Sequence, residues 1–249
     1  MNVRDPSPAT AGLTAVVLNH DERGIGVPML LHTGASLGPA PATEQFSTDG
    51  YLRQAALGLR LFDTGDLGGE QTGAHLLALN FHEVPAGSRR LAAERVRRMR
   101  DLGEPYDPDG TGTGPQVALA FYDGDASTAL WAAELCSRLD IRAWFYPVRW
   151  TSLEEGRRVT DDELADIATA HELAFHTATH RSAVEVTPAT VAAEVTEVVE
   201  RLTRAAGRPP RLGAWRGGAR FDADELGNRA IRDLGVTHLV SNWSVERID

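Results

Sequence analysis

The chain has 249 residues, with 35 acidic and 25 basic side chains and a formal net charge of −10. This acidic balance argues against nucleic acid or an anionic membrane surface as the main partner. Every basic residue is arginine, so reactions that need a lysine amine, such as Schiff-base chemistry, are excluded. Because 42% of the residues are hydrophobic, the chain can bury a sizeable core as one catalytic domain.

Cysteine content and the first residues bear on the cellular compartment. The single Cys136 rules out an internal disulfide framework. Residues 1–12 lack the basic start and apolar core of a secretory signal, and no stretch approaches the roughly 18 apolar residues of a membrane span. We therefore expect a cytoplasmic protein with a flexible leader, no membrane contact and a small intracellular substrate. The sequence leaves the oligomeric state open.

The first part of the chain has the apolar patterns of three strands and two helices, joined by loops rich in Gly and Pro. The predicted strands are 13–18, 27–31 and 75–81, the predicted helices are 50–62 and 89–102, and the predicted loops are 34–48 and 104–116. The helix at 89–102 is strongly basic, which in an acidic chain is typical of a solvated face.

Strands and helices alternate regularly in the rest of the chain. The predicted strands are 117–121, 142–148, 172–175, 211–215 and 236–241, and the predicted helices are 127–139, 161–170, 188–205 and 223–234. Such alternation implies an α/β fold with a parallel sheet and right-handed crossovers.

Two histidines four residues apart, His176 and His180, follow the apolar segment 172–175. A single helical turn would bring both rings to the same side, where they could bind one zinc ion at about 2.0 to 2.1 Å. Solvated surface histidines often share this spacing, so a metal site needs a third ligand.

Asp123 is the candidate for that third ligand, because it directly follows the buried strand 117–121 and Tyr122. In parallel α/β folds, side chains from distant segments converge at the carboxyl ends of the strands. One carboxylate and two imidazoles at this end would make a three-ligand site with open positions for water or substrate. The alternative is a turn aspartate and two solvated histidines.

These motifs, in this order, resemble the polysaccharide deacetylase (NodB-homology) family, over roughly His75 to the carboxyl end. In that family a strand ends in Asp-Asp-Gly, a His-Ser/Thr-x-x-His motif follows, and the second Asp and both His bind the metal. The other segments that resemble family motifs are 79–84, 144–148, 213–218 and 242–246. The resemblance implies a distorted (β/α) barrel over 75–249, with 13–74 as an N-terminal extension packed on it.

The resemblance also implies a metal-dependent hydrolase that removes an acetyl group from nitrogen, with Asp123, His176 and His180 as ligands. Zinc is the expected metal, and iron, cobalt or nickel are the alternatives. Trp215 and Trp243 are candidates for lining a substrate pocket. Arg216 could orient the substrate through its planar guanidinium, although core packing for the tryptophans and solvent exposure for the arginine are competing interpretations.

Two departures from the family remove its proton carriers. The general base, the first Asp of Asp-Asp-Gly, is Tyr122 here, and no histidine follows the fourth motif before Asp249. A phenol with a pKa near 10 could act only as a hydrogen-bond donor, or as a base if its pKa were strongly lowered. Asp125 is the nearest replacement base in sequence. His82 follows a strand, and His32 resembles the late family histidine moved by circular permutation.

Two other functions fit the same three ligands. One carboxylate and two imidazoles also form the facial triad of non-haem iron oxygenases, which need open coordination positions more than an acid and base pair. A pseudoenzyme would keep the metal for stability alone. It would then show a metal-dependent rise in melting temperature without turnover.

Overall fold

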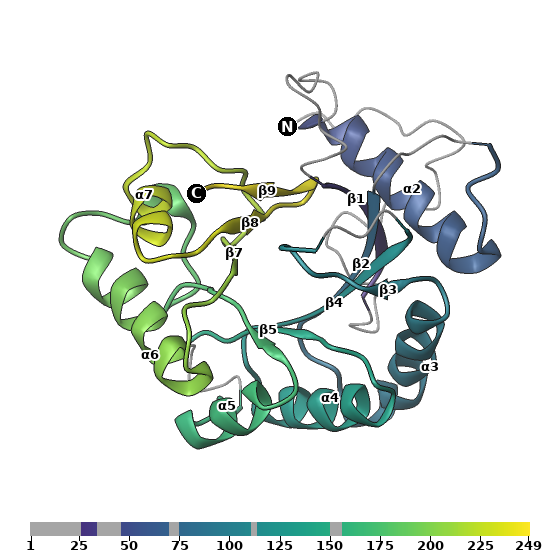
Figure 1. Cartoon of the computed structure of the whole chain (residues 1–249), viewed down its shortest axis with the longest axis horizontal. Coiled ribbons are helices and arrows are strands. Elements are labelled where there is room, and N and C mark those ends of the chain that lie inside the picture. The colour runs from purple at the N-terminus through teal and green to yellow at the C-terminus, as the bar shows by residue number, and fades with distance from the viewer. Residues whose placement is uncertain (1–25, 34–45, 70–74, 111–113, 150–155) are drawn as a thin grey trace.

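The computed structural model describes residues 26–33, 46–69, 75–110, 114–149 and 156–249 (Figure 1). The expected leader, the strand at 13–18 and most of the loop at 34–48 lie outside these residues. Within them, no helix is both long and apolar enough to cross a membrane.

The strands and helices follow the predicted order, with two additional short strands that were not predicted: Glu104–Pro105, inside the predicted loop at 104–116, and Ser244–Arg247. The strands are β1 (Pro28–Thr33), β2 (His75–Phe81), β3 (Glu104–Pro105), β4 (Gln116–Tyr122), β5 (Trp144–Tyr146), β6 (Glu172–Leu173), β7 (Leu212–Ala214), β8 (His238–Val240) and β9 (Ser244–Arg247). The helices are α2 (Thr48–Thr64), α3 (Arg89–Arg100), α4 (Ala126–Arg138), α5 (Asp161–Ala168), α6 (Glu197–Ala206) and α7 (Leu226–Asp233). Short 3-10 segments, Ala86–Ser88 and Ala183–Glu185, and a π-helical segment, Ala192–Thr196, complete the described elements.

The strands form one sheet in the order β6-β5-β4-β2-β1-β9-β8-β7, with β3 paired to β4. The pairs β1–β2 and β8–β9 are antiparallel, and the other pairs are parallel. A parallel bridge between Phe175 and Gly213 joins the two ends of this order. The Phe175 N–H donates to Leu212 O at 2.8 Å, and the Ala214 N–H donates to Phe175 O at 3.0 Å. The sheet thus closes into a ring with helices outside it (Figure 1), which confirms the distorted (β/α) barrel.

Side chains along the strands alternate between two hydrophobic clusters, as the two-residue period of a strand requires. In β2, Leu77 and Leu79 pack in the larger cluster with residues of the helices, whereas Leu76 and Ala78 pack in a second cluster with residues of the facing strands. The second cluster therefore fills the ring. It includes Trp144, Tyr146 and Tyr106 and, as a partly buried member, Tyr122.

The described part of the predicted N-terminal extension joins the ring itself. Strand β1 lies between β2 and β9. Helix α2 is fixed to the turn between β8 and β9, because Gln54 Nε2 donates to Trp243 O at 2.7 Å and the indole of Trp243 contacts Tyr51 edge to face. The division into a leader, an extension at 13–74 and a catalytic domain at 75–249 stays a prediction.

The helix predicted at 188–205 is interrupted. A π-helical segment, Ala192–Thr196, precedes α6, and Gly207 ends α6 in the left-handed conformation with φ 72°. Within the π segment, the main-chain oxygen of Glu194 accepts a hydrogen bond from the Ala178 N–H at 3.3 Å. A contact to a distant loop breaks the regular pattern here, and apolar spacing alone cannot reveal it.

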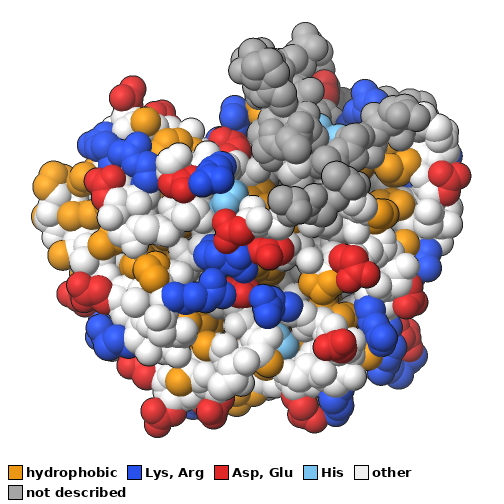
Figure 2. All heavy atoms as spheres, in the orientation of Figure 1, with side chains coloured by type: hydrophobic (Ala, Val, Ile, Leu, Met, Phe, Trp, Pro, Cys, Tyr) orange, Lys and Arg blue, Asp and Glu red, His pale blue; other side chains and the backbone are white. Residues whose placement is uncertain are grey.

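Ion pairs hold several elements together on the surface. Figure 2 shows arginine and acidic side chains interleaved near the middle of one face of the molecule. The largest such group has Glu172, which is 5% exposed, at its centre. Arg142, Arg208 and Arg211 all pair with its carboxylate. Arg211 also pairs with Asp107 at 2.6 Å and with Asp109 at 2.7 Å, so its charge is shared among three acidic groups.

Candidate metal centre

Asp123 leaves β4 through a tight left-handed turn. Asp123 has φ 65° and Gly124 has φ 68°, and the Asp123 N–H donates to Tyr146 O at 2.9 Å. Position 124 requires glycine, because a Cβ atom there would lie 3.0 Å from the Cβ of Pro147. Positive φ is uncommon outside glycine, although aspartate adopts it more readily than most residues. The turn therefore fixes the Asp123 carboxylate just beyond the end of the strand.

His176 is buried, with 2% of its surface exposed, and one hydrogen bond determines its tautomer. Its Nδ1 lies 2.6 Å from the main-chain oxygen of Ala214, which can only accept, so Nδ1 carries the proton. Nε2 is then unprotonated and has a lone pair available for a metal. Metal-binding histidines commonly have this arrangement, in which a carbonyl orients the ring through its other nitrogen.

His180 reaches the same place by a different route from the one the sequence predicts. Residues 176–180 form a turn and no helix, so the expected helical turn is wrong. His180 has φ 58°, and this left-handed conformation directs its ring back toward Asp123. A helix cannot include Phe175, because the main chain of Phe175 is hydrogen-bonded to β7.

The three side chains converge. Asp123 Oδ1 lies 3.7 Å from His176 Nε2 and 3.7 Å from His180 Nε2. Two ligand atoms at about 2.1 Å from one tetrahedral zinc would be about 3.4 Å apart, so the observed separations fit a shared cation. Asp123 Oδ1 and His176 Nε2 are both buried without a hydrogen-bond partner in the described structure. Among the described residues, this is the only group of three or more potential ligands with such convergence.

The electrostatics and exposure of the site suit a metal centre with open positions. The pKa of His176 is lowered to about 4, chiefly by burial and in smaller part by His180 and His82, against the opposing effects of Asp123 and of the hydrogen bond to Ala214. His176 is therefore neutral at pH 7, as a metal ligand must be. The side chains of Asp123 and His180 are 24% and 39% exposed, so water or a substrate has access from their side.

Tyr122 and His82 lie beside the three ligands because of strand register. Phe81 pairs with Phe121, so His82 lies beside Tyr122, and Tyr122 pairs with Tyr146. The three rings therefore stack along the inner face. The ring of Tyr122 lies between His82, at 5.3 Å, and Tyr146, at 4.4 Å, measured between ring centroids. It also meets the ring of His176 edge to face at 5.7 Å.

Tyr122 does not have the lowered pKa that a general base would need. Burial raises its pKa well above 10, and the negative charge of Asp123 raises it further. A hydrogen bond with Tyr146 has a smaller, opposite effect. Tyr122 is therefore protonated at neutral pH.

A family comparison decides the membership of the chain. The model of the family described as polysaccharide deacetylase matches residues 109–239, which is more than half of the chain and includes Asp123, His176 and His180. The chain belongs to the polysaccharide deacetylase family. This confirms the resemblance seen in the motifs and supports a hydrolase of the deacetylase type.

Solved structures show the same fold at low sequence identity. IcaB from Ammonifex degensii is 18% identical with a TM-score of 0.56, and the match covers 68% of this chain and 84% of that one. A de-N-acetylase from Aggregatibacter actinomycetemcomitans is 17% identical with a TM-score of 0.51, covering 69% of this chain and 90% of that one. No curated protein sequence gave a significant match.

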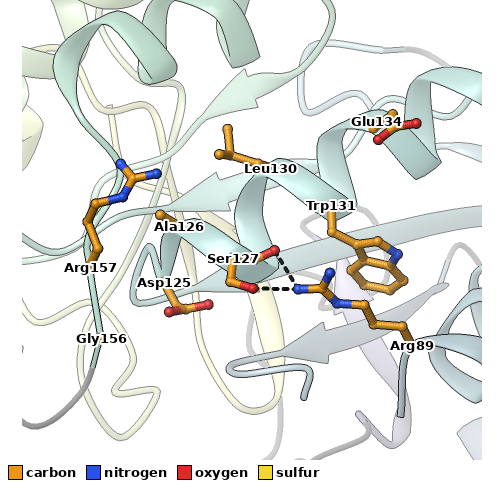
Figure 3. A pocket seen from close by; sticks show the side chains of 9 residues that line it. All are labelled: Arg89, Asp125, Ala126, Ser127, Leu130, Trp131, Glu134, Gly156 and Arg157. Atoms are coloured by element: carbon orange, nitrogen blue, oxygen red, sulfur yellow. Dashed lines mark hydrogen bonds between the residues drawn. The ribbon is translucent and has the colours of Figure 1, made fainter. Parts of the chain in front are cut away.

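Asp125, the replacement base suggested by sequence, has another role in this deacetylase. Its Oδ1 accepts a hydrogen bond from the Thr128 N–H at 2.8 Å and caps α4. Its side chain lines a pocket of about 540 Å³ outside the metal centre, together with Arg89, Trp131 and Arg157 (Figure 3). The structure therefore gives Asp125 a capping role, and its action as a base beside the three ligands stays a hypothesis.

His32, the other proton carrier proposed from sequence, lies at the opposite end of the ring. β1 runs antiparallel to β2, so His32 pairs with His75 at the start of β2. The seven residues of β2 span about 20 Å between that pair and the metal centre. The circular-permutation hypothesis, which would place His32 beside the three ligands, is therefore wrong, because β1 runs antiparallel to β2.

The three candidates for substrate binding differ in burial and in their contacts. Trp215 is only 2% exposed, and its indole donates to Asn228 Oδ1 at 2.8 Å, so it belongs to the core and cannot line an open pocket. Trp243 anchors α2 and is used for packing. Arg216 is exposed and pairs with Glu185 at 2.7 Å, on the segment that follows the His180 turn. Of the three, only Arg216 remains a candidate for substrate binding.

Sequence reasoning missed two residues that support the site. Tyr146 stacks on Tyr122 and shares its hydrogen bond. Glu194 is buried and binds the main chain of the turn that carries His180. An acidic residue within the apolar stripe at 188–205 was the available signal for Glu194, because a buried carboxylate requires partners.

Proposed function

We propose that this protein is a metal-dependent deacetylase that removes the acetyl group from the nitrogen of an amino sugar. The observation that carries the proposal is the convergence of three ligand atoms from Asp123, His176 and His180. Two of these atoms are buried and otherwise unpartnered, which is costly unless a cation lies between them.

The donor set suits several divalent metals. Two neutral imidazoles and one carboxylate, at tetrahedral spacing, favour zinc, and iron, cobalt and nickel share these ligand types. When bound, such a metal polarises a carbonyl and lowers the pKa of a coordinated water to about 7. The residues around it then have to orient the acetamide and move protons.

His82 is the proton carrier that the geometry favours. It stacks on Tyr122 and lies close enough to His176 to influence its pKa, whereas Asp125 and His32 are directed elsewhere. We propose that His82 accepts a proton from the attacking water and returns it to the leaving amine. Tyr122, held protonated, donates its hydroxyl hydrogen to the developing oxyanion.

The size of the substrate distinguishes two forms of the proposal. The first form is a small intracellular substrate, an N-acetyl amino sugar or a biosynthetic intermediate. Family membership favours a sugar within a polymer. Both forms use the same acetamide chemistry, so the test compares N-acetylated monosaccharides with their oligomers.

The decisive assay measures acetate release by protein loaded separately with zinc and with iron(II), with and without oxygen. Release under zinc without oxygen, lost in a His180→Ala variant and retained in a His75→Ala control, supports the deacetylase. Oxygen consumption under iron alone would replace the proposal with an oxygenase. A zinc-dependent rise in melting temperature with neither reaction would identify a binding protein without turnover.

A further inference from the structure

We propose that Glu194 is a positioning residue that holds the turn carrying His180 in its ligand-binding conformation. Glu194 lies in the π-helical segment before α6, fourteen positions from His180 in sequence, and does not itself reach the three ligand atoms. The link to metal rests on the proposed function. The effect on the turn does not, because it belongs to the metal-free protein.

The side chain of Glu194 and its main-chain oxygen contact the His180 turn. Its Oε2 accepts from the Thr179 N–H at 3.0 Å, and its Oε1 accepts from the Thr179 hydroxyl at 2.6 Å. The same Oε1 lies 3.1 Å from Arg181 Nε. Its main-chain oxygen accepts from the Ala178 N–H. Glu194 therefore binds residues on both sides of His180 and one residue further upstream.

Burial makes these contacts strong. Glu194 is 5% exposed, so its charge would be costly without partners. The two hydrogen bonds from Thr179 and the ion pair with Arg181 provide those partners, and both carboxylate oxygens are used as acceptors. Charge-assisted hydrogen bonds of this kind are roughly twice as strong as neutral ones.

His180 needs such support because its backbone conformation is unfavourable. A non-glycine residue with φ 58° persists only when the surrounding structure enforces it. Thr177 adds a local contact, since its hydroxyl oxygen accepts from the Arg181 N–H. Glu194 fixes this local turn to a helix of the barrel, so that the His180 ring has a defined position relative to Asp123.

The π segment supplies the geometry for this contact. A π turn is rare and frequently lies at functional sites. Here it lies where the main-chain oxygen and the carboxylate of Glu194 both bind the same loop. The π-helical segment thus positions Glu194 to bind the turn in which His180 has its left-handed conformation.

Glu194→Gln is the informative variant, because it keeps the size of the side chain. An amide is neutral and replaces one carboxylate oxygen with an NH2 donor, so with its oxygen accepting from the Thr179 N–H it presents a donor to Arg181 Nε and loses the ion pair. Thr179→Val is a milder second variant that removes only the hydroxyl. Glu197→Gln is the matched control, because Glu197 begins α6 and pairs with Arg149 on the surface.

Two measurements test the proposal on the full-length protein. Titration with cobalt(II), followed by visible absorption, gives metal affinity. Amide hydrogen exchange of the metal-free protein reports the order of the turn. We expect Glu194→Gln to lower cobalt affinity by about 10- to 100-fold, as loss of a supporting residue does, and to accelerate exchange at Thr179. Thr179→Val should show smaller changes in the same direction, and Glu197→Gln should show none.

The outcomes separate this proposal from the proposed function. Unchanged exchange at Thr179 in Glu194→Gln would overturn the positioning role, whatever the metal does. Failure of the wild-type protein to bind cobalt would overturn the metal-dependent function, while the exchange data would still decide whether Glu194 orders the turn. If Glu194→Gln does not fold, wild-type exchange and affinity in Thr179→Val would count against the role.

Discussion

Two histidine pairs lie at opposite ends of the same ring and differ in how their nitrogens are used. At the carboxyl ends of the strands, His176 and His180 direct Nε2 toward one oxygen of Asp123. At the start of β2, His32 Nδ1 and His75 Nε2 share a hydrogen bond at 2.7 Å. The facing nitrogens of the second pair bond to each other, and His75 Nδ1 is buried without a partner among the described residues, whereas the first pair directs two nitrogens at one carboxylate oxygen.

The difference shows what distinguishes a metal site from a structural histidine pair. Among the described residues, only the first pair has a carboxylate within ligand distance. It also has strained backbone, since Asp123 and His180 are two of the three described non-glycine residues with positive φ. The other end of the ring is built from regular strand pairing and needs no such strain.

Loss of a ligand should produce the largest difference between the two ends. We expect His176→Ala to lower zinc affinity by more than about 100-fold, because a direct ligand should matter more than a supporting residue. His75→Ala should leave zinc affinity within about 2-fold of the wild type. Isothermal titration with zinc measures both, and equal losses in the two variants would contradict the assignment.

Loss of the proposed proton carrier should affect turnover more than metal binding. His82→Asn should reduce kcat for acetate release by about 100- to 10,000-fold, the usual contribution of general acid–base catalysis. Zinc content should stay the same. His32→Asn, at the opposite end, serves as the control. A similar kcat in both variants would show that neither histidine moves the proton.

Substitutions at Asp125 test whether this residue is a helix cap or a catalytic base. Asp125→Ala should destabilise the fold by about 1 kcal/mol, because the Thr128 N–H loses its acceptor. Asp125→Asn keeps an acceptor oxygen and should restore most of that stability with nearly wild-type kcat. Chemical denaturation and initial rates measure the two effects. A large loss of kcat in Asp125→Asn would restore the base that the sequence suggested.

The two ends of the ring should share one pH dependence of stability. Burial lowers the pKa of both His75 and His176 to about 4, below the value near 6.5 of the unfolded chain. The unfolded state therefore binds protons first as the pH falls. Stability of the metal-free protein should be full above pH 6.5 and decline toward pH 4. Denaturation midpoints for the wild type and His75→Gln should show a shallower decline in the variant.

The fold was largely accessible from sequence because apolar periodicity and turn residues mark the elements locally. The prediction placed β2 at its observed bounds and most other elements within a few residues. The antiparallel direction of β1 could not be predicted from the sequence, since the direction of a strand in the sheet depends on pairing with distant segments. That one feature moved His32 to the wrong end of the molecule.

The candidate site was also predictable only in part. Asp123, His176 and His180 converge as the strand ends implied, although through left-handed turns in place of a helix. Core packing of Trp215 was one of the two interpretations that the sequence offered, whereas the capping bond of Asp125 was not predicted. Register, which aligns His82 with Tyr122 and Tyr146, decides which side chains meet.

The most direct test is a crystal structure of the zinc-soaked protein with anomalous data collected at the zinc edge. The account predicts one strong peak about 2.0 to 2.2 Å from Asp123 Oδ1, His176 Nε2 and His180 Nε2. A peak at His32 and His75 in its place, or no peak among the three side chains, would contradict it.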